Sequence, residues 1–409
     1  MDPYSPIFES TQQKQPRFNI LELYSGIGGF HYALKDLLEM MQITDYQITA
    51  ADINTTANAV YRHNHLREGK HVLLQRNIKS FTAKELDQMR LNLITMSPPC
   101  QPFSRLGLKR DLNDHRCDSF QHLMSTLPLL SHPPEFIMLE NVKGFDTSEA
   151  HELLIETLIK CNYQFAEFLL SPTQFSIPNS RQRYYLIARK AKQTGDHLSK
   201  AEYVANIHSQ VPLVASDQSI FANDAKVSFV DHISLCSKSS PTVKPGNFCS
   251  TIEPYLDSTV EPAEFEPTSD TLLRYHALFD LVTRHSTSTN CFTKSYAHRI
   301  EGCGSILMTA SNLSMDGVYA EIAQLKSQQQ TDDADDETSG KIVQLLRSLG
   351  LRFFTPREVA NLMSFPPNFE FPPDLNLKQQ YRVLGNSVNV LVCQYLLRIL
   401  LGLRPGVAL

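Results

Sequence analysis

The sequence lacks the features of a secreted or membrane protein. Its first residues, MDPYSPIFES, are acidic and polar and include neither the basic nor the apolar stretch of a secretory signal. We therefore expect the mature chain to begin at Met1. The one strongly apolar stretch, Val388–Leu403, is shorter than a bilayer span and contains Gln394 and Arg398. It predicts a buried helix, and no membrane partner is expected.

Cysteine motifs are also absent. The eight cysteines are scattered along the chain, with no CxxC pair and no tight spacing. This pattern argues against a zinc site and against a disulfide framework, so no metal is expected. The expected location is a reducing compartment, the cytoplasm and also the nucleus.

The chain has no excess of basic residues. Its net charge is −5, and residues 332–337 hold five acidic side chains, which equal that whole charge. A nucleic-acid partner would therefore have to be held by a local basic surface. The surrounding stretch, Ser327–Gly340, has almost no apolar side chain and predicts a mobile loop.

A length of 409 residues predicts one large domain and a smaller one. In the first half, short apolar runs alternate with amphipathic stretches, which is typical of an α/β, doubly wound sheet covered by helices. The predicted strands are 19–24, 47–53, 91–97, 135–141 and 183–189.

The amino-acid composition changes after Lys190. The following residues are rich in Ser, Thr and Pro, and their apolar positions show only weak periodicity. Near the C-terminus a helical seam returns, with apolar residues at 388, 391, 392, 395, 396, 399 and 400. We therefore predict a large domain from 17–190 and 376–409, with residues 191–375 as a smaller inserted domain.

A glycine-rich turn, Tyr24–Gly29, lies between the first predicted strand and a helix. Glycines there let a ligand approach the backbone at a helix N-terminus, although such a turn is as often only structural. The second strand ends at Asp52, where doubly wound folds place an acid that accepts ribose hydroxyls. Together they favour an adenosine-containing cofactor. The alternative for Asp52 is a cap of the helix that begins near Asn54.

A stiff loop, Ser97–Ser104 (SPPCQPFS), follows a strand and presents a cysteine. The flanking prolines restrict the backbone and hold the Cys100 thiol at the carboxyl end of the strand. This favours a nucleophile over the alternative, an inert packing residue.

An acid and two arginines complete the candidate site. Glu140 ends an apolar run, where burial would raise its pKa and let it hold a proton; the alternative is a capping or ion-paired residue. Arg181 and Arg183 open a strand on one face and could contact a phosphate or a base oxygen. The alternative for both is a solvated strand edge.

With SPPCQPFS and LENV both present in that order, the chain resembles the cytosine-5 methyltransferases, over residues 19–190 and 354–400. The resemblance implies a Rossmann-like S-adenosylmethionine methyltransferase domain with a smaller target-recognition domain. It also covers Arg181-x-Arg183, Thr355–Phe365 and Gly385–Val388. In that family the cysteine adds to C6 of cytosine, the glutamate holds N3, and the arginines support catalysis. The implied catalytic residues are Cys100, Glu140, Arg181 and Arg183.

The resemblance also implies a binding set for S-adenosylmethionine. These cofactor-binding residues are Tyr24, Ser25, Ile27, Gly28, Gly29, Asp52, Ile53, Ile78, Lys79, Ser97, Asn386 and Ser387.

One branch of the family is resembled most. Asn290–Thr293 and Tyr296 are similar to the Cys-Phe-Thr motif of the branch that methylates a cytosine in the tRNA anticodon loop, typically of aspartate tRNA. Arg299 and Cys303 depart from that branch, where tyrosine and threonine are usual. The implied substrate-binding residues are Gln101, Ser104, Cys291, Phe292, Thr293 and Tyr296.

The expected function is thus tRNA cytosine-5 methylation by a monomer. The alternatives are a DNA cytosine-5 methyltransferase with the same site and a cofactor-binding adaptor without turnover. The alternative for the Cys291–Thr293 segment is core packing beneath a loop.

Overall fold

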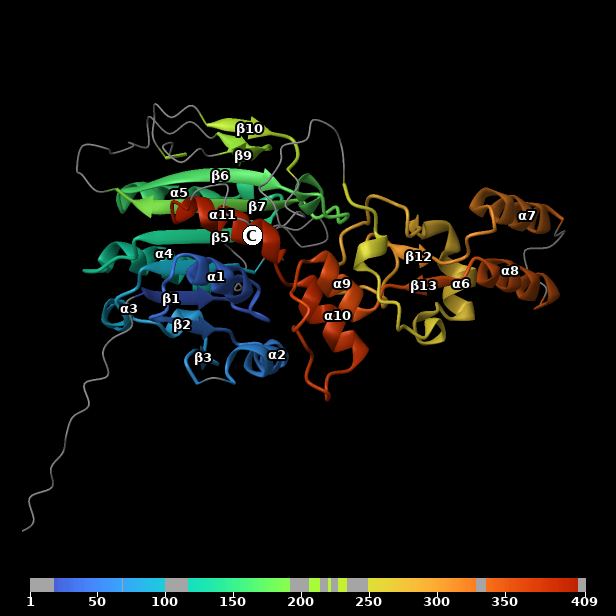
Figure 1. The fold of residues 1–409 in the computed structure, drawn as a ribbon, viewed down its shortest axis with the longest axis horizontal. Helices are drawn as coiled ribbons and strands as arrows, with labels where there is room; N and C mark the ends of the chain where they lie inside the picture. Colours follow the sequence, from blue (N-terminus) through green and yellow to red (C-terminus); the bar gives the residue numbers. More distant parts are fainter. Residues whose placement is uncertain are drawn as a thin grey trace, which may run out of the picture.

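The computed structural model describes residues 18–67, 69–99, 117–191, 206–213, 220–221, 227–233, 249–328 and 336–403. The predicted nucleophile Cys100 and the predicted substrate contacts Gln101 and Ser104 lie outside the described residues. The chain forms two lobes, a larger one around an extended sheet and a smaller one beside it, with helices α9 and α10 between them (Figure 1).

The larger lobe is built on an eight-stranded sheet in the order β3-β2-β1-β4-β5-β7-β6-β8. Its strands are β1 (Phe18–Leu23), β2 (Tyr46–Ala51), β3 (Val72–Leu74), β4 (Leu93–Met96), β5 (Phe136–Val142), β6 (Tyr163–Leu170), β7 (Arg183–Lys190) and β8 (Ile207–His208). All five predicted strands form, each within two residues of its predicted ends.

Strand β7 runs against its neighbours. The pairs of β1 with β2 and β4, of β2 with β3, and of β4 with β5 are parallel. In contrast, β7 pairs antiparallel with both β5 and β6. The sequence predicted a parallel sheet; β7 departs from this pattern because no helix long enough to return the chain connects it to β6.

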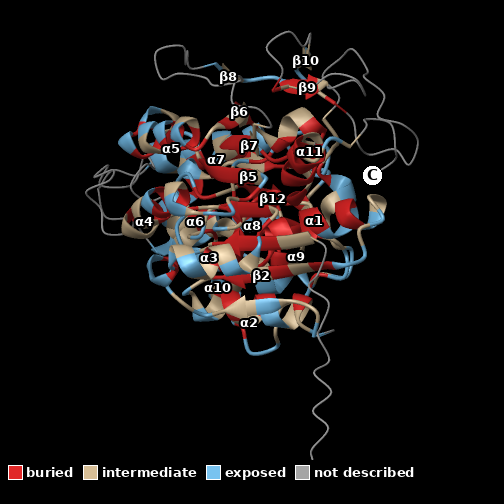
Figure 2. Cartoon of the chain, turned by 90° about the vertical axis from the view of Figure 1, so that its left-hand side faces the viewer, coloured by how far each residue is buried: buried red, intermediate tan, exposed pale blue. Residues whose placement is uncertain are grey.

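Both faces of the sheet are covered, as a doubly wound fold requires. Alternating residues of each strand enter two separate cores: Ile20 and Tyr185 belong to one, while Leu21 and Tyr184 belong to the other. Helices α1 and α11 pack together on the first face, and α4 and α5 contribute to the second core. Figure 2 shows these strands and α11 as mostly buried. The predicted fold class is confirmed.

The helices of the larger lobe are α1 (Gly29–Met40), α2 (Thr55–His65), α3 (Ala83–Met89), α4 (Asp118–Thr126), α5 (Glu149–Lys160) and α11 (Val390–Leu400). The C-terminal helix is the predicted seam, and Val392, Leu396 and Leu400 on it are buried. The stretch Leu377–Leu400 is long and apolar enough for a membrane span, but 78% of an apolar 18-residue window within it is buried in the fold. It is therefore core structure, as predicted.

The smaller lobe contains a three-stranded sheet, β11-β12-β13, packed with helices. Its elements and those of the joining region are β11 (Leu281–Val282), β12 (Ile306–Met308), β13 (Leu351–Phe353), α6 (Ser269–Tyr275), α7 (Met315–Ser327), α8 (Asp336–Ser348), α9 (Pro356–Leu362) and α10 (Leu377–Gly385). A separate ribbon pairs β9 (Val211–Leu213) with β10 (Ser228–Val230).

The sequence predicts two further boundaries, one in the acidic stretch and one at residue 190. The predicted loop Ser327–Gly340 was wrong at its end, because residues 336–340 form the first turns of α8. Asp336 and Glu337 suit a helix start, and the Glu337 carboxylate accepts a hydrogen bond from Lys341 (Oε1 to Nζ, 2.7 Å). The division of the chain at residue 190 stays a prediction; β8, which follows it, pairs with β6 in the large sheet.

Candidate active site

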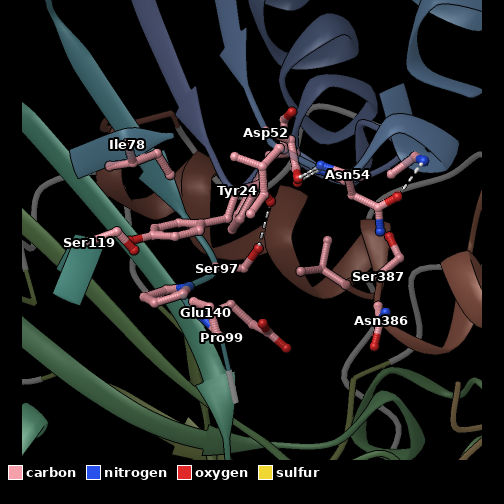
Figure 3. Close-up of a pocket in the computed structure, with 18 of the residues that line it drawn as sticks. Tyr24, Asp52, Asn54, Ile78, Ser97, Pro99, Ser119, Glu140, Asn386 and Ser387 are labelled. Atoms are coloured by element: carbon pink, nitrogen blue, oxygen red, sulfur yellow. Dashed lines mark hydrogen bonds between the residues drawn. The ribbon is translucent and has the colours of Figure 1, made fainter. Parts of the chain in front are cut away.

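A cavity of about 590 Å³ lies at the carboxyl ends of the parallel strands. Four strands end at this cavity, and a predicted residue at the end of each strand lines it. Tyr24 follows β1, Asp52 follows β2, Ser97 follows β4, and Glu140 lies near the end of β5. In Figure 3, Asp52 and Asn54 lie on one side of the cavity, Glu140 and Pro99 on the other, and Tyr24 and Ser97 between them. Residues far apart in the chain thus share one site because parallel strands end at one edge.

Nineteen residues of the sequence-based prediction or its motifs line this cavity. They are Tyr24, Ser25, Gly26, Gly29, Asp52, Ile53, Ile78, Lys79, Ser97, Pro98, Pro99, Glu140, Val142, Arg181, Arg183, Gly385, Asn386, Ser387 and Val388.

The glycine-rich turn is tightly wound. Tyr24 and Gly26 have positive φ values of 55° and 54°, and Gly28, at 83°, is the N-cap of α1. Ile27 and Gly28, however, do not line the cavity: Ile27 is buried, and a Cβ on Gly28 would lie 2.2 Å from Nε2 of His65. Packing against His65 and the positive φ of this residue therefore both require glycine at position 28, and the cofactor contacts of Ile27 and Gly28 stay a prediction.

Asp52 organises the turn. Its Oδ2 accepts a hydrogen bond from the Gly26 amide at 2.9 Å, and its Oδ1 accepts one from the Asn54 amide at 2.8 Å. The N-cap of α2 is Asn54, whose side chain accepts from the Ala57 amide, so the helix-cap alternative for Asp52 is wrong. Burial raises the pKa of Asp52, and the two amides oppose this shift.

The tyrosine of the turn connects the cavity to α4. The Tyr24 hydroxyl lies 2.9 Å from the Ser119 hydroxyl, and the Tyr24 carbonyl accepts a hydrogen bond from Ser97 at 3.2 Å. Lys79 forms an ion pair with Asp118 (Nζ to Oδ2, 2.9 Å). These contacts hold the start of α4 against the side of the cavity where Ile78 and Lys79 lie.

Glu140 is the buried acid of the site. Burial raises its pKa, while the guanidinium groups of Arg183 and Arg181 lower it by a smaller amount. The Nε of Arg183 lies 3.5 Å from Oε1 of Glu140. The ion-pair alternative therefore describes a real contact, and the net effect still leaves a carboxyl that holds a proton at higher pH than usual.

The two arginines both point toward Cys291, as their alternation predicts. Arg181 Nη1 lies 3.3 Å and Arg183 Nη2 lies 3.7 Å from the sulfur. Burial raises the pKa of the Cys291 thiol, but the two guanidinium groups outweigh it, so the pKa lies below its usual range. The solvated-edge alternative is wrong for Arg181, which is only 3% exposed.

The rest of the predicted substrate segment is packed. Phe292 and Tyr296 are buried in edge-to-face contact, and the Tyr296 hydroxyl donates to the Ser305 carbonyl and accepts from the Phe354 amide. Thr293 is half-buried, and its amide donates to the Cys303 carbonyl at 3.1 Å. The structure thus gives Phe292 and Tyr296 a packing role, and their direct contact with substrate stays a prediction.

Eight cavity residues were missed by sequence reasoning. They are Phe30, Asn54, Ala57, Arg76, Asn77, Asp118, Ser119 and Val383. Phe30, Asn54 and Asn77 directly neighbour a predicted residue, which is a usable signal. Asp118 and Ser119 had none, because they reach the cavity from a helix start 18 residues or more beyond Cys100.

The chain matches the family described as C-5 cytosine-specific DNA methylase over residues 18–401. It belongs to the cytosine-5 methyltransferases. The resemblance stated from the motifs is therefore confirmed.

Relatives of similar length support this assignment. A Homo sapiens tRNA (cytosine(38)-C(5))-methyltransferase is 36% identical, covering 93% of this chain and 98% of the relative. A Dictyostelium discoideum DNA (cytosine-5)-methyltransferase is 35% identical, covering 94% and 95%. Among solved structures, Spodoptera frugiperda DNMT2 has a TM-score of 0.71 at 35% identity, covering 94% of this chain and 99% of that one.

Membership of the family implies S-adenosylmethionine as methyl donor, and the cavity fits it. Ser25 has a buried hydroxyl without a hydrogen-bond partner at the glycine-rich turn. Each Asp52 oxygen accepts one amide and keeps a lone pair for a ribose hydroxyl. Ile53 is 67% exposed beside it, an apolar side chain available to cover an adenine.

Proposed function

We propose that this protein transfers the methyl group of S-adenosylmethionine to C5 of a cytosine in tRNA. Glu140 carries the chemical part of the proposal, because it is a buried, proton-holding carboxyl beside Arg183 at the end of the cavity away from Asp52. The names of the human and other relatives support tRNA as the substrate. We further propose the anticodon loop of aspartate tRNA as the target.

The proposed reaction runs through a covalent adduct. Cytosine C5 is too weak a nucleophile to take a methyl group directly, so the Cys100 thiolate adds to C6 while Glu140 gives a proton to N3. This leaves an electron-rich carbon at C5. S-adenosylmethionine supplies the methyl group as an electrophilic sulfonium methyl. After methyl transfer to C5, which leaves S-adenosylhomocysteine, a water molecule takes the C5 proton, the Cys100 thiolate is expelled from C6, and N3 returns its proton to Glu140.

In this scheme, different residues bind the methyl donor and act on the cytosine. Asp52 and the cavity-lining residues Ser25, Gly26 and Gly29 of the turn hold the donor, since Asp52 is hydrogen-bonded to the Gly26 amide. Glu140 lies opposite, beside Pro99, the residue before Cys100. A raised pKa keeps Glu140 able to donate its proton near neutral pH. The base must leave its stack to reach this depth.

DNA methylation is the second candidate function. It is favoured by the Dictyostelium discoideum relative, which is a DNA (cytosine-5)-methyltransferase, and it uses the same chemistry. We also propose that the protein works as a monomer. We propose a reducing compartment, the cytoplasm or nucleus, as its location, and this is supported by the free thiols at Cys161, Cys291, Cys303 and Cys393.

One assay separates these candidates. The purified chain is incubated with methyl-labelled S-adenosylmethionine and, separately, unmodified aspartate tRNA transcript, the same transcript with cytosine 38 replaced by uridine, and genomic DNA. We expect label only in the first. Label in DNA alone would support the second candidate. Cofactor binding without label in any nucleic acid would mean an adaptor without turnover.

A further inference from the structure

Arg181 makes an unusual set of contacts for a residue expected to act on a base. Its Nη1 donates to the Phe292 carbonyl at 3.2 Å, and its Nη2 donates to the carbonyls of Gly385 at 3.2 Å and Ser387 at 2.5 Å. These acceptors lie 111, 204 and 206 residues away in sequence. One buried guanidinium therefore joins three separate segments of the chain.

A second feature lies at the same place. A Cβ on Gly385 would lie 2.1 Å from the Lys294 nitrogen and 2.2 Å from the Thr293 carbonyl carbon. No side chain fits there, because backbone touches backbone. The segment Cys291–Lys294 and the loop Gly385–Ser387 are thus held together both by Arg181 and by direct contact.

We propose that Arg181 is a positioning residue, which fixes the loop Gly385–Ser387 at the cofactor cavity against the segment Cys291–Lys294. It does not touch the base in this assignment; Arg183, which faces Glu140, is the arginine available for that task. Gly385 and Ser387 line the cavity, so the position of this loop sets the shape of the cofactor site. The inference rests on the proposed use of the cavity for S-adenosylmethionine.

The chemistry explains why arginine is needed. Guanidinium presents donors on two outward nitrogens at fixed angles, so it can serve Phe292 on one side and Gly385 and Ser387 on the other. A lysine has one nitrogen and cannot span acceptors that require two. Lysine keeps the positive charge, however, so Arg181→Lys separates the geometry from the charge.

The test measures cofactor-site affinity apart from methyl transfer. S-adenosylhomocysteine is titrated by calorimetry into Arg181→Lys, Gly385→Ala, Arg183→Lys and a matched control, Arg189→Lys. Arg189 lies near the far end of β7, the strand that follows Arg181, and its guanidinium donates to Oε1 of Gln164. We expect the dissociation constant to rise at least tenfold in the first two variants and to stay within threefold in the last two.

Methyl transfer to tRNA is then measured under single-turnover conditions at saturating cofactor. At this cofactor concentration Arg181→Lys should reach most of the wild-type rate, whereas Arg183→Lys should remain slow. The double variant Arg181→Lys/Gly385→Ala should lose less affinity for S-adenosylhomocysteine than the sum of the two single losses. Both changes disturb the same contact, between the loop Gly385–Ser387 and the segment Cys291–Lys294.

Unchanged affinity in Arg181→Lys together with a rate that saturating cofactor does not restore would overturn the proposal and make Arg181 a catalytic residue. If Arg181→Lys does not fold, Gly385→Ala decides alone, and wild-type affinity there would also overturn it. The titrations contain no nucleic acid, so they remain decisive if the tRNA substrate is wrong.

Discussion

The Nε of Arg183 lies 3.5 Å from Oε1 of Glu140, and both side chains line the cavity that also contains Asp52. Burial raises the pKa of Glu140 more than Arg183 and Arg181 lower it. The pair therefore keeps a carboxyl that can give up a proton, next to a cation that stabilises its anion afterwards. This arrangement suits protonation of a base nitrogen followed by recovery of the proton.

Replacing Cys100 by alanine should abolish methyl transfer while S-adenosylhomocysteine affinity changes less than threefold, since the thiol acts on the base. Denaturing electrophoresis after reaction with RNA containing 5-fluorocytosine gives a direct readout. The shifted covalent band should be absent in Cys100→Ala and present in Cys291→Ser. A band that follows Cys291 instead would identify a different nucleophile.

Asp52→Ala should weaken binding of S-adenosylhomocysteine by roughly ten- to a hundredfold, because a charge-assisted hydrogen bond contributes about 1.5–3 kcal/mol. The rate at saturating cofactor should fall much less. Asp87→Ala is the matched control, since Asp87 also accepts two backbone amides, from Ser131 and His132, but does not line the cavity. Equal calorimetric affinity in both variants would limit Asp52 to holding the turn.

The buried carboxyl of Glu22 should make the stability of the fold decrease as pH rises. This β1 residue is fully buried, accepts a hydrogen bond from Tyr61, and burial raises its pKa to about 8. A raised folded-state pKa means that the folded chain binds the proton more tightly than the unfolded chain, whose Glu titrates near 4.5. The stabilisation is therefore complete below that value and is lost as pH rises toward 8.

Glu22→Gln mimics the protonated form and removes this dependence. In urea unfolding, the free energy of unfolding of the variant should rise relative to that of the wild type by about 1.4 kcal/mol for each pH unit between those two pKa values. The difference between the two proteins cancels the titration of the nearby histidines, His31 and His65. Parallel stability curves across this range would contradict a buried, titrating Glu22.

Glu358→Ala should destabilise the fold by about 3–5 kcal/mol, because it leaves Arg352 buried without its partner. The two side chains form a bidentate pair at 2.8 and 2.7 Å and are 0% and 5% exposed. The exposed pair of Lys341 and Glu337 is the control, and Glu337→Ala should leave the midpoint of thermal unfolding unchanged. Similar midpoints in both variants would refute the importance of burial.

Much of this protein was determined by local sequence. Short alternating strands, the glycine-rich turn and the motif around Cys100 each depend on neighbours within a few residues, and the sheet edge then brings their ends together. That is why Tyr24, Asp52, Ser97 and Glu140 could be assigned to one site in advance.

The tertiary structure decided which groups those residues meet. The reversed direction of β7, the packing of Gly28 against His65, and the ties of Arg181 to Phe292 and Ser387 join positions that no local pattern relates. A guanidinium bonds whichever carbonyls the folded chain places about 3 Å away, and a glycine is required wherever another atom occupies the space of a Cβ. Sequence spacing records neither distance, so only the fold shows that Arg181 meets the carbonyls of Phe292 and Ser387 while Arg183 meets Glu140.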